Sequence, residues 1–369
     1  MDSSIEQQIK VIENEILNTQ KNKATEHHIG KLKAKLARLR EEAEKHKRAG
    51  AKGKGFSIKK SGDASVGIIG FPNAGKSTLL NHLTEASSKI GVYDFTTLDV
   101  IPGMMKHKGA DIQILDLPGV IEGASKGKGK GREILSAIRN VDLVLIMIDL
   151  QHLEHLEIIE RELYDAGLRI NQREPDVVVN KKMMGGITVN STTKLTHLNE
   201  NLIKSIASEF VINADITIRE DITEDQLIDF FSENRIYASA IVVLNKKDLI
   251  DEEFLNVAID SFGGRGWNVI SISADRGDGL NELREGIFSQ LRLIRVYMKP
   301  VGKQTDYDEP LILKEGDTVK DACSKIHRDF RSKFRYASVS GPSAKHDVQK
   351  VGLDHILKDE DVLTVVIRR

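Results

Sequence analysis

The chain has 369 residues with 54 Lys and Arg against 55 Asp and Glu, which gives a formal net charge of -1 at pH 7. This length exceeds the roughly 100–200 residues of one domain, and no apolar run is long enough to span a bilayer, which excludes a membrane-embedded protein. A single cysteine, Cys323, excludes an internal disulfide and a cysteine-based metal site, and we expect it to pack on a helix. Neither end carries a secretory, myristoylation or prenylation signal, so we expect a cytoplasmic protein.

Residues 1–50 are predicted to form a basic helical hairpin. Apolar residues recur at helical spacing over 5–16 and again over 29–39. Residues 21–60 carry fourteen Lys and Arg against four Glu. We expect the apolar stripes to pack on each other or on a partner, and the cations to face outward and neutralise nucleic-acid phosphates. A solvated surface helix is the alternative, and residues 51–63 are interpreted as a basic, Gly-rich linker.

Residues 70–77 read Gly-Phe-Pro-Asn-Ala-Gly-Lys-Ser, the pattern of a phosphate loop. They follow the apolar run 64–69 and precede a helix-like stretch, which is the context the motif requires. Main-chain N–H groups can surround a phosphate there, Lys76 can reach the outer phosphates and Ser77 can ligate Mg²⁺. The expected phosphate contacts are Asn73, Ala74, Gly75, Lys76, Ser77 and Thr78. The alternative is an ordinary Gly-rich turn, which three further motifs in the correct order make less favoured.

Two segments are expected to sense Mg²⁺ and a terminal phosphate. Asp116-Leu-Pro-Gly119 closes an apolar run, which places a carboxylate near the phosphate loop, where it holds Mg²⁺ through water. Gly119 then supplies a free N–H. Between the two motifs, residues 93–98 offer a hydroxyl that completes the Mg²⁺ shell, and we choose Thr97 over Thr96. A β-prone Thr pair packing on a sheet is the alternative. The expected Mg²⁺ ligands are Ser77, Thr97 and Asp116.

Asn245-Lys-Lys-Asp248, after the apolar run 238–244, is predicted to select the base. An ionised Asp248 only accepts hydrogen bonds, so it suits guanine, which presents N1–H and an exocyclic amine. Mispaired buried polar groups would discriminate against adenine by a factor of roughly 10⁴ or more. Asn245 and the stem of Lys246 would support the loop and the base, and residues 273–275 would close over the base with main-chain N–H groups. The expected guanine contacts are Asn245, Lys246, Asp248, Ser273 and Ala274.

The nucleotide-binding domain is expected to cover 64–290 and to be interrupted at 168–237. About seventy residues there exceed what a loop inside a compact domain holds. They show β-like and helix-like patterns of their own, near 176–179, 187–189, 200–210 and 223–233. We therefore predict an inserted α+β module that docks or braces and holds no catalytic constellation.

Residues 291–369 are predicted to form a separate β-grasp domain. A β-like segment at 310–313 precedes a helix from 318 to about 330, and a final strand spans 362–367. Thr318 and Asp321 have the spacing of a capping box at the start of that helix.

Together these motifs resemble those of the Obg-related translation GTPases. Nearly the whole chain resembles their eukaryotic and archaeal branch, the developmentally regulated GTP-binding proteins, and its length and layout suit the ribosome-associated yeast member. The resemblance implies an α/β P-loop GTPase domain with a mostly parallel sheet, an insertion similar to a small-subunit ribosomal protein, and a C-terminal TGS domain. The motifs that carry it lie at 70–78, 95–98, 116–119 and 245–248.

The resemblance also implies a function and partners. It implies GTP hydrolysis to GDP by a ribosome-associated switch in translation, with Mg²⁺, contact with RNA and a regulatory protein partner. We expect no membrane association and no obligate homo-oligomer. Two alternatives remain: a GTP-loaded RNA or ribosome adaptor whose hydrolysis is incidental, and a signalling GTPase directed at proteins.

One position departs from Ras-like enzymes. Val120 follows Gly119 where those enzymes carry a Gln that orients the attacking water, so we expect slow intrinsic hydrolysis. In related GTPases with an apolar residue there, a loop Asn coordinates K⁺, and Asn73 occupies the matching position. The resemblance thus implies K⁺ stimulation, and the alternative is an Asn73 that only caps the turn. The residues expected to act in catalysis are Asn73, Lys76, Thr97 and Gly119.

Overall fold

A computed structural model describes residues 2–20, 22, 25–50, 61–84, 101–117, 137–232 and 235–368. Two compact units divide the chain: Met1–Gly55 with Gly167–Tyr237, and Phe56–Ala166 with Ala238–Arg369. The N-terminal hairpin and the insertion thus belong to the same unit. Among the described residues, no helix has both the length and the apolar character required to cross a membrane. The expected linker at 51–63 lies outside the described residues apart from its last three positions.

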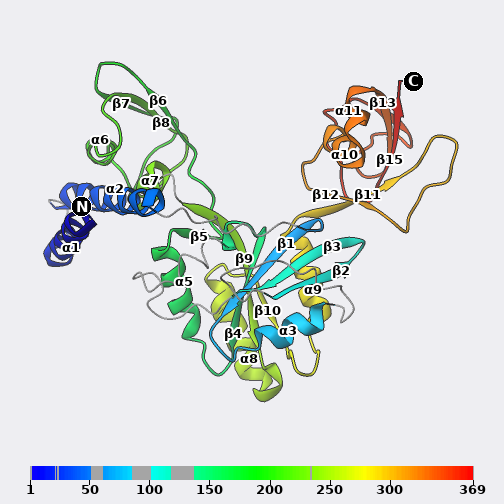
Figure 1. Cartoon of the computed structure of the whole chain (residues 1–369), viewed down its shortest axis with the longest axis horizontal. Coiled ribbons are helices and arrows are strands. Elements are labelled where there is room, and N and C mark those ends of the chain that lie inside the picture. The colour runs from blue at the N-terminus through cyan, green and yellow to red at the C-terminus, as the bar shows by residue number, and fades with distance from the viewer. Residues whose placement is uncertain are drawn as a thin grey trace. The chain divides into compact units, whose positions relative to one another are not determined.

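The second unit is built on a largely parallel sheet with the strand order β10-β9-β4-β1-β3-β2 (Figure 1). Only the pairing of β2 with β3 is antiparallel along this path. The strands are β1 (Ala64–Gly70), β2 (Ile101–His107), β3 (Ala110–Asp116), β4 (Leu143–Asp149), β9 (Ile236–Asn245) and β10 (Val269–Ser271). This arrangement confirms the predicted α/β class.

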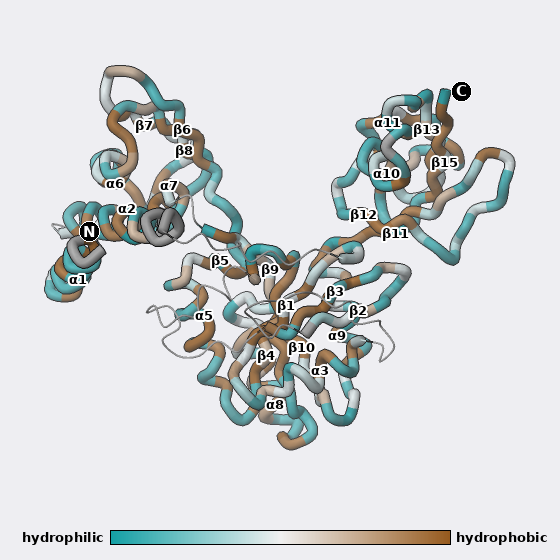
Figure 2. Tube along the Cα trace, viewed as in Figure 1, coloured by the Kyte–Doolittle hydropathy of each residue, from teal (hydrophilic) through white to brown (hydrophobic). Residues whose placement is uncertain are grey.

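The central strands are apolar on both faces because helices cover both faces. Every residue of β1 and of β4 is buried, as parallel strands between two helical layers require, and Figure 2 shows their hydrophobic character. Leu79 of α3 and Leu283 of α9 share a buried cluster with Ile68 of β1. Ile159 of α5 is also fully buried. The helices are α3 (Lys76–Leu83), α5 (His155–Asp165), α8 (Glu252–Gly264) and α9 (Leu280–Gln290).

The strand register brings four chain segments together at one edge of the sheet. Ile68 lies opposite Asp116, and Asp149 lies opposite Asn245. Gly70, the last residue of β1, lies opposite Met147. The carboxyl ends of β1, β3, β4 and β9 therefore meet, which is where ligands bind in open α/β sheets.

The C-terminal part of this unit is a β-grasp domain with the strand order β12-β11-β15-β13-β14. Its central pair, β11 and β15, is parallel. The elements are β11 (Leu293–Met298), β12 (Leu311–Lys314), α10 (Val319–Ile326), α11 (Arg328–Ser332), β13 (Phe334–Ser340), β14 (Gln349–Val351) and β15 (Asp361–Ile367). Cys323 lies fully buried on α10, and the Thr318–Asp321 capping box is present, as predicted.

The expected single helix from 318 to about 330 is wrong, because it is two helices. His327 is extended, with φ -165° and ψ 142°, and ends α10. Its Nδ1 accepts a hydrogen bond from the N–H of Asp329 at 3.2 Å, so the same residue caps α11. A side chain that satisfies a helix N-terminus favours a new helix start over continuation of the old helix.

The first unit contains a three-stranded sheet with the order β6-β8-β7. Its middle strand, β8, was not predicted, although Ala214, Ile216 and Ile218 alternate and are fully buried. Arg169 of β5 pairs with the buried carboxylate of Asp229 of α7. The elements are β5 (Leu168–Ile170), β6 (Val177–Lys181), β7 (Ile187–Ser191), α6 (Glu200–Ala207), β8 (Ala214–Ile218) and α7 (Glu224–Phe231).

The N-terminal hairpin consists of α1 (Asp2–Asn18) and α2 (Glu26–Gly50), and its apolar stripes pack on each other. Helix α2 also packs on the insertion, because Ala34 is fully buried in one cluster with Leu202. At Gly30 a Cβ atom would lie only 2.7 Å from the Leu202 side chain. The hairpin is therefore part of the core of this unit, with the insertion itself as the partner.

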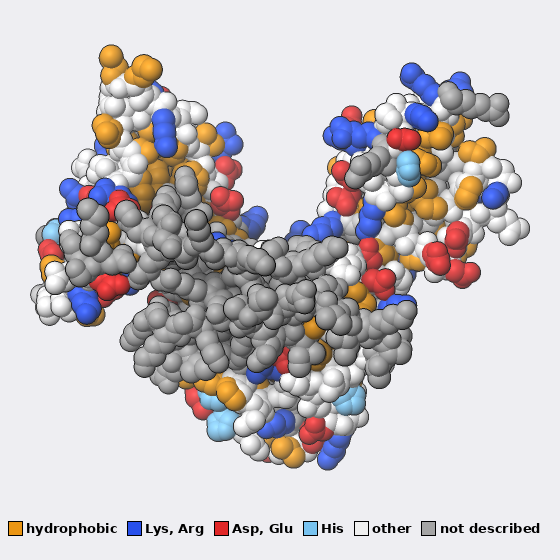
Figure 3. Space-filling view, viewed as in Figure 1, with side chains coloured by type: hydrophobic (Ala, Val, Ile, Leu, Met, Phe, Trp, Pro, Cys, Tyr) orange, Lys and Arg blue, Asp and Glu red, His pale blue; other side chains and the backbone are white. Residues whose placement is uncertain are grey.

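Three cations of α2, Lys31, Lys33 and Arg38, form ion pairs with acidic residues of the insertion. Lys33 Nζ lies 3.0 Å from a carboxylate oxygen of Asp225, and Arg38 Nη1 donates to the carbonyl of Glu209 at 2.9 Å. Figure 3 shows basic and acidic side chains interspersed on this unit. The expectation of outward-facing cations therefore needs correction at these positions, because packing of α2 on the insertion brings the cations to opposite charges.

Candidate functional site

The phosphate-loop motif joins the end of β1 to the start of α3. Two of its residues have left-handed backbone conformations, Asn73 with φ 65° and Gly75 with φ 93°. A Cβ atom on Gly75 would lie 2.4 Å from Asn245 Nδ2, so both conformation and space require glycine there. Ala74 is buried, and Thr78 lies in the first turn of α3. The shape of the loop is thus determined by the left-handed backbone of Asn73 and Gly75 and by the close approach of Asn245 to Gly75.

Lys76 is half-buried and turns back along the loop. Its Nζ donates to the carbonyl of Gly70 at 3.2 Å and to that of Phe71 at 3.0 Å. Burial lowers the pKa of Lys76, and the nearby charge of Asp116 opposes this effect. The ammonium therefore lies within the loop, where an anionic group would stabilise its charged form.

Two of the residues expected to hold Mg²⁺ are in direct contact. The hydroxyl of Ser77 donates to Asp116 Oδ2 at 2.7 Å. A hydroxyl and a carboxylate are the oxygen ligands that Mg²⁺ prefers, together with water and phosphate oxygens, so this donor set fits the ion. The remaining candidates in this region, Thr97, Gly119 and Val120, lie outside the described residues.

Asn245 is buried and joins the phosphate loop to the loop after β10. Its Nδ2 donates to the carbonyl of Ala74 at 2.8 Å, and its Oδ1 accepts from the N–H of Ala274 at 2.9 Å. The side chain is only 3% exposed. One amide thus fixes the distance between a loop that can hold phosphates and a loop that can hold a base.

Lys246 has a left-handed backbone, with φ 67°, and its Nζ lies 2.6 Å from Asp149 Oδ2. Burial opposes ionisation of Asp149, but hydrogen bonds from Lys246 and from the N–H of Gln151 outweigh it and hold its pKa below the usual value. Asp149 was not predicted as a site residue. Its signal in the sequence is a lone carboxylate at the end of the wholly apolar strand β4.

Asp248 lies in the short 3₁₀ turn Lys247–Leu249. A hydrogen bond from the Ser273 hydroxyl, the largest effect, holds the pKa of Asp248 below its usual value, and the charge of Arg276 adds to it. Arg276 Nε lies 3.5 Å from Asp248 Oδ2. Asp248 is therefore an ionised acceptor near neutral pH.

The two N–H groups expected to contact the base already have partners in the protein. The N–H of Ser273 donates to the carbonyl of Asp278 at 2.9 Å, and that of Ala274 donates to Asn245. In this structure Ser273 and Ala274 contact the two motif residues, Asp248 through the Ser273 hydroxyl and Asn245 through the Ala274 N–H.

Three family models match the chain. One, described as a 50S ribosome-binding GTPase, covers residues 65–181. A second, described as the C-terminal region of the MMR_HSR1 domain, covers 184–293, and the TGS domain covers 294–367. The matched segments thus include the phosphate loop, the base motif and the β-grasp domain.

Relatives from archaea, animals and fungi are similar to the chain over almost its full length. An uncharacterised GTP-binding protein of Methanocaldococcus jannaschii is 52% identical over 366 residues, covering 99% of this chain and 93% of that protein. Developmentally regulated GTP-binding protein 1 of Xenopus laevis is 45% identical over 363 residues, covering 97% and 98%. Ribosome-interacting GTPase 1 of Saccharomyces cerevisiae is 44% identical over 371 residues, covering 99% of each.

Likeness at this level over nearly the whole of both chains agrees with the site geometry, in which the phosphate and base motifs meet at one edge of the sheet. The chain belongs to the developmentally regulated GTP-binding proteins.

Proposed function

We propose that the chain binds GTP with Mg²⁺, hydrolyses it to GDP and phosphate, and acts in the cytoplasm as a ribosome-associated switch in translation. The observation that carries this proposal is the pair of hydrogen bonds by which Asn245 joins the phosphate loop to the base loop. Such a link holds the phosphate loop and the base loop at a fixed separation, which suits a ligand that has both a triphosphate and a base. RNA and a regulatory protein are the further partners we propose.

Each group in the site has a role that follows from its chemistry. Lys76 would neutralise the outer phosphates, and Ser77 and Asp116, the latter through water, would hold Mg²⁺, which would supply positive charge. Asp248 accepts from the two donors of guanine. Thr97 and Gly119, both outside the described residues, would sense the terminal phosphate. Water attacks in line, so catalysis is a matter of positioning and charge neutralisation.

Asn73 is proposed to coordinate a catalytic K⁺. It is exposed and left-handed, and among the described residues its side chain has no hydrogen-bond partner. A turn-capping Asn would bond to a nearby main-chain group, and the Asn73 side chain makes no such bond within the described part of the phosphate loop. K⁺ there would supply charge between the phosphates as an arginine finger does.

Ribosome association is supported by the similarity to the yeast Ribosome-interacting GTPase 1 and by the basic charge of the hairpin. Lys35 is an exposed residue of α2, whereas Lys33 and Arg38 are engaged with the insertion. The positive charge that the hairpin offers to RNA phosphates is therefore expected to come from Lys35 and from cations nearer the end of α2. Deletion of 21–60 would remove the buried Ala34 as well, so substitution is the cleaner test.

Replacement of Asn73 by Ala should abolish K⁺ stimulation of GTP turnover. In the unaltered protein we expect turnover at least about tenfold faster in K⁺ than in Na⁺. This is a smaller effect than the increase in kcat of about 10³–10⁵-fold that an arginine finger supplies. The measurement is phosphate release at matched ionic strength, with Asn256→Ala, an exposed Asn on α8, as the matched control. Equal turnover in K⁺ and Na⁺ by the unaltered protein would contradict the role of Asn73.

Replacement of Asp248 by Asn should change base selectivity from guanine to xanthine. Xanthine has a carbonyl where guanine has its exocyclic amine, and an Asn amide can donate to it. We expect GDP affinity to fall at least about 100-fold and XDP affinity to rise, within the range that buried polar mismatches produce. Fluorescent nucleotide titrations measure both, with Asp260→Asn on α8 as the control. Unchanged GDP affinity would show that Asp248 does not contact the base.

Replacement of Lys35, Lys45 and Lys47 by Gln should weaken ribosome binding and make it less salt-dependent. Each lost phosphate contact removes roughly 0.7–0.9 from the slope of log affinity against log salt. Co-sedimentation with purified ribosomes over a salt series measures this slope, and an unchanged far-UV circular dichroism spectrum shows that the helices of the variant remain folded. A binding curve indifferent to both salt and these substitutions would rule out the electrostatic account.

A further inference from the structure

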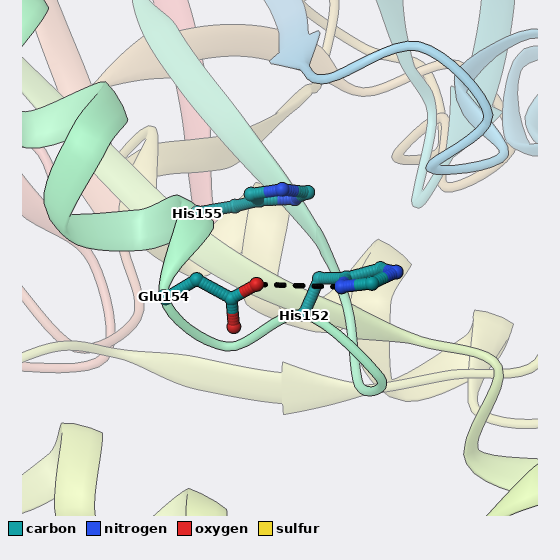
Figure 4. Close-up of side chains that lie close together, drawn as sticks. All are labelled: His152, Glu154 and His155. Atoms are coloured by element: carbon teal, nitrogen blue, oxygen red, sulfur yellow. Dashed lines mark hydrogen bonds and ion pairs between the residues drawn. The ribbon is translucent and has the colours of Figure 1, made fainter.

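A cluster of potential metal ligands lies where the chain passes from β4 into α5. His152, Glu154 and His155 each offer one ligand atom, and these atoms all lie within 4.8 Å of one another. Figure 4 shows the Glu154 carboxylate directed at the His152 ring, with the His155 ring on the same side of the turn. Within the described residues, this is the one group of His, Cys, Asp or Glu side chains that meets such a spacing.

The two rings and the carboxylate are close enough for one ion to bind all three. His152 Nδ1 lies 3.3 Å from Glu154 Oε1, and the centroids of the His152 and His155 rings are 5.1 Å apart. Ligand atoms of a tetrahedral ion lie about 3.3 Å apart, given bonds of about 2.0–2.1 Å. His152 and Glu154 are exposed and His155 is half-buried, so small side-chain rotations close the remaining distance.

The backbone of this turn fixes the spacing of the ligands. The N–H of His152 donates to the carbonyl of Asp149 at 2.8 Å, and the N–H of His155 donates to the carbonyl of His152 at 3.2 Å. Glu154 has helical dihedral angles, with φ -60° and ψ -21°. The backbone of the three ligand residues is therefore preorganised by main-chain hydrogen bonds, which reduces the conformational entropy lost when an ion binds.

We propose that His152, Glu154 and His155 form a site for a divalent transition-metal ion of the zinc class. Two imidazoles and one carboxylate are a ligand set typical of Zn²⁺, with water in the fourth position, and are a poor set for Mg²⁺. The site is distinct from the pair Ser77 and Asp116, which offers only oxygen ligands.

The site contacts the phosphate loop directly and is linked to the base motif through Asp149. The His155 ring stacks on Phe71 with centroids 4.0 Å apart and an interplanar angle of 20°. The carbonyl of Phe71 accepts the hydrogen bond from Lys76. Asp149, which accepts the main-chain hydrogen bond of His152, also pairs with Lys246. An ion that restrains His155 would thus restrain Phe71, so we expect its binding to be coupled to nucleotide affinity, a consequence that rests on the proposed function.

The site is tested by titrating nucleotide-free, full-length protein with zinc chloride, using calorimetry or competition with a chromogenic chelator. The expected result is one saturable ion per chain in the unaltered protein and in His346→Gln, an exposed His in the C-terminal domain. The His152→Gln/His155→Gln double variant should bind Zn²⁺ at least about tenfold more weakly. Loss of even a residue that only hydrogen-bonds to a metal ligand lowers metal affinity roughly 10–100-fold. Glu154→Gln, an exposed single change, should weaken binding as well.

Zinc affinity that is the same in the double variant and in the unaltered protein would overturn the proposed site. The coupling is tested by GDP affinity with and without Zn²⁺: a change of about threefold or more in the unaltered protein, absent from the double variant, is expected. An identical response in both would show that Zn²⁺ acts on the nucleotide itself, and would overturn the coupling. Because the zinc titration contains no nucleotide, failure of GDP binding would contradict only the proposed function.

Discussion

The buried amide of Asn245 accepts a hydrogen bond from the N–H of Ala274 and donates one to the carbonyl of Ala74, and so spans the two loops of the nucleotide site. Both alanines are themselves buried. Removal of this amide would leave a buried carbonyl and a buried N–H unsatisfied, at a cost of about 1–3 kcal/mol each. The same amide explains Gly75, because no side chain fits beside Asn245 Nδ2. The shape of the phosphate loop thus depends on a residue of the base motif.

The sheet makes this link possible by aligning the ends of β4 and β9. Asp149 lies opposite Asn245, and its carboxylate holds Lys246. The insertion lies between these strands in sequence, yet the N–H of Ile236 donates to the carbonyl of Gly167 at 3.1 Å, so its two ends lie close together. A chain that leaves and returns at neighbouring points can hold a folded module without disturbing the pairing of β4 with β9.

The phosphate loop, Asp116 and the base motif could be predicted from the sequence because each follows an apolar strand and has fixed spacing. The burial of Ala34 could not be predicted, because the sequence of a helix does not show which of its alanines will pack against a distant segment. His327 was missed for a related reason: whether a helix continues or restarts depends on which N–H its ring accepts from. Asp149 could have been predicted as a site residue, because it is the single carboxylate at the end of an otherwise apolar strand. What the sequence does not show is therefore mainly contact between distant segments.

The affinity of Asn245→Ala for GDP tests most directly the claim that one side chain couples the phosphate loop to the base loop. Trp267, whose Nε1 donates to Glu160 at 3.1 Å in the same unit, reports by fluorescence that the domain remains folded. The account predicts a GDP affinity at least about 30-fold weaker, because each of the two loops loses a hydrogen-bond partner whose loss costs about 1–3 kcal/mol. An unchanged GDP affinity in a folded variant would contradict it.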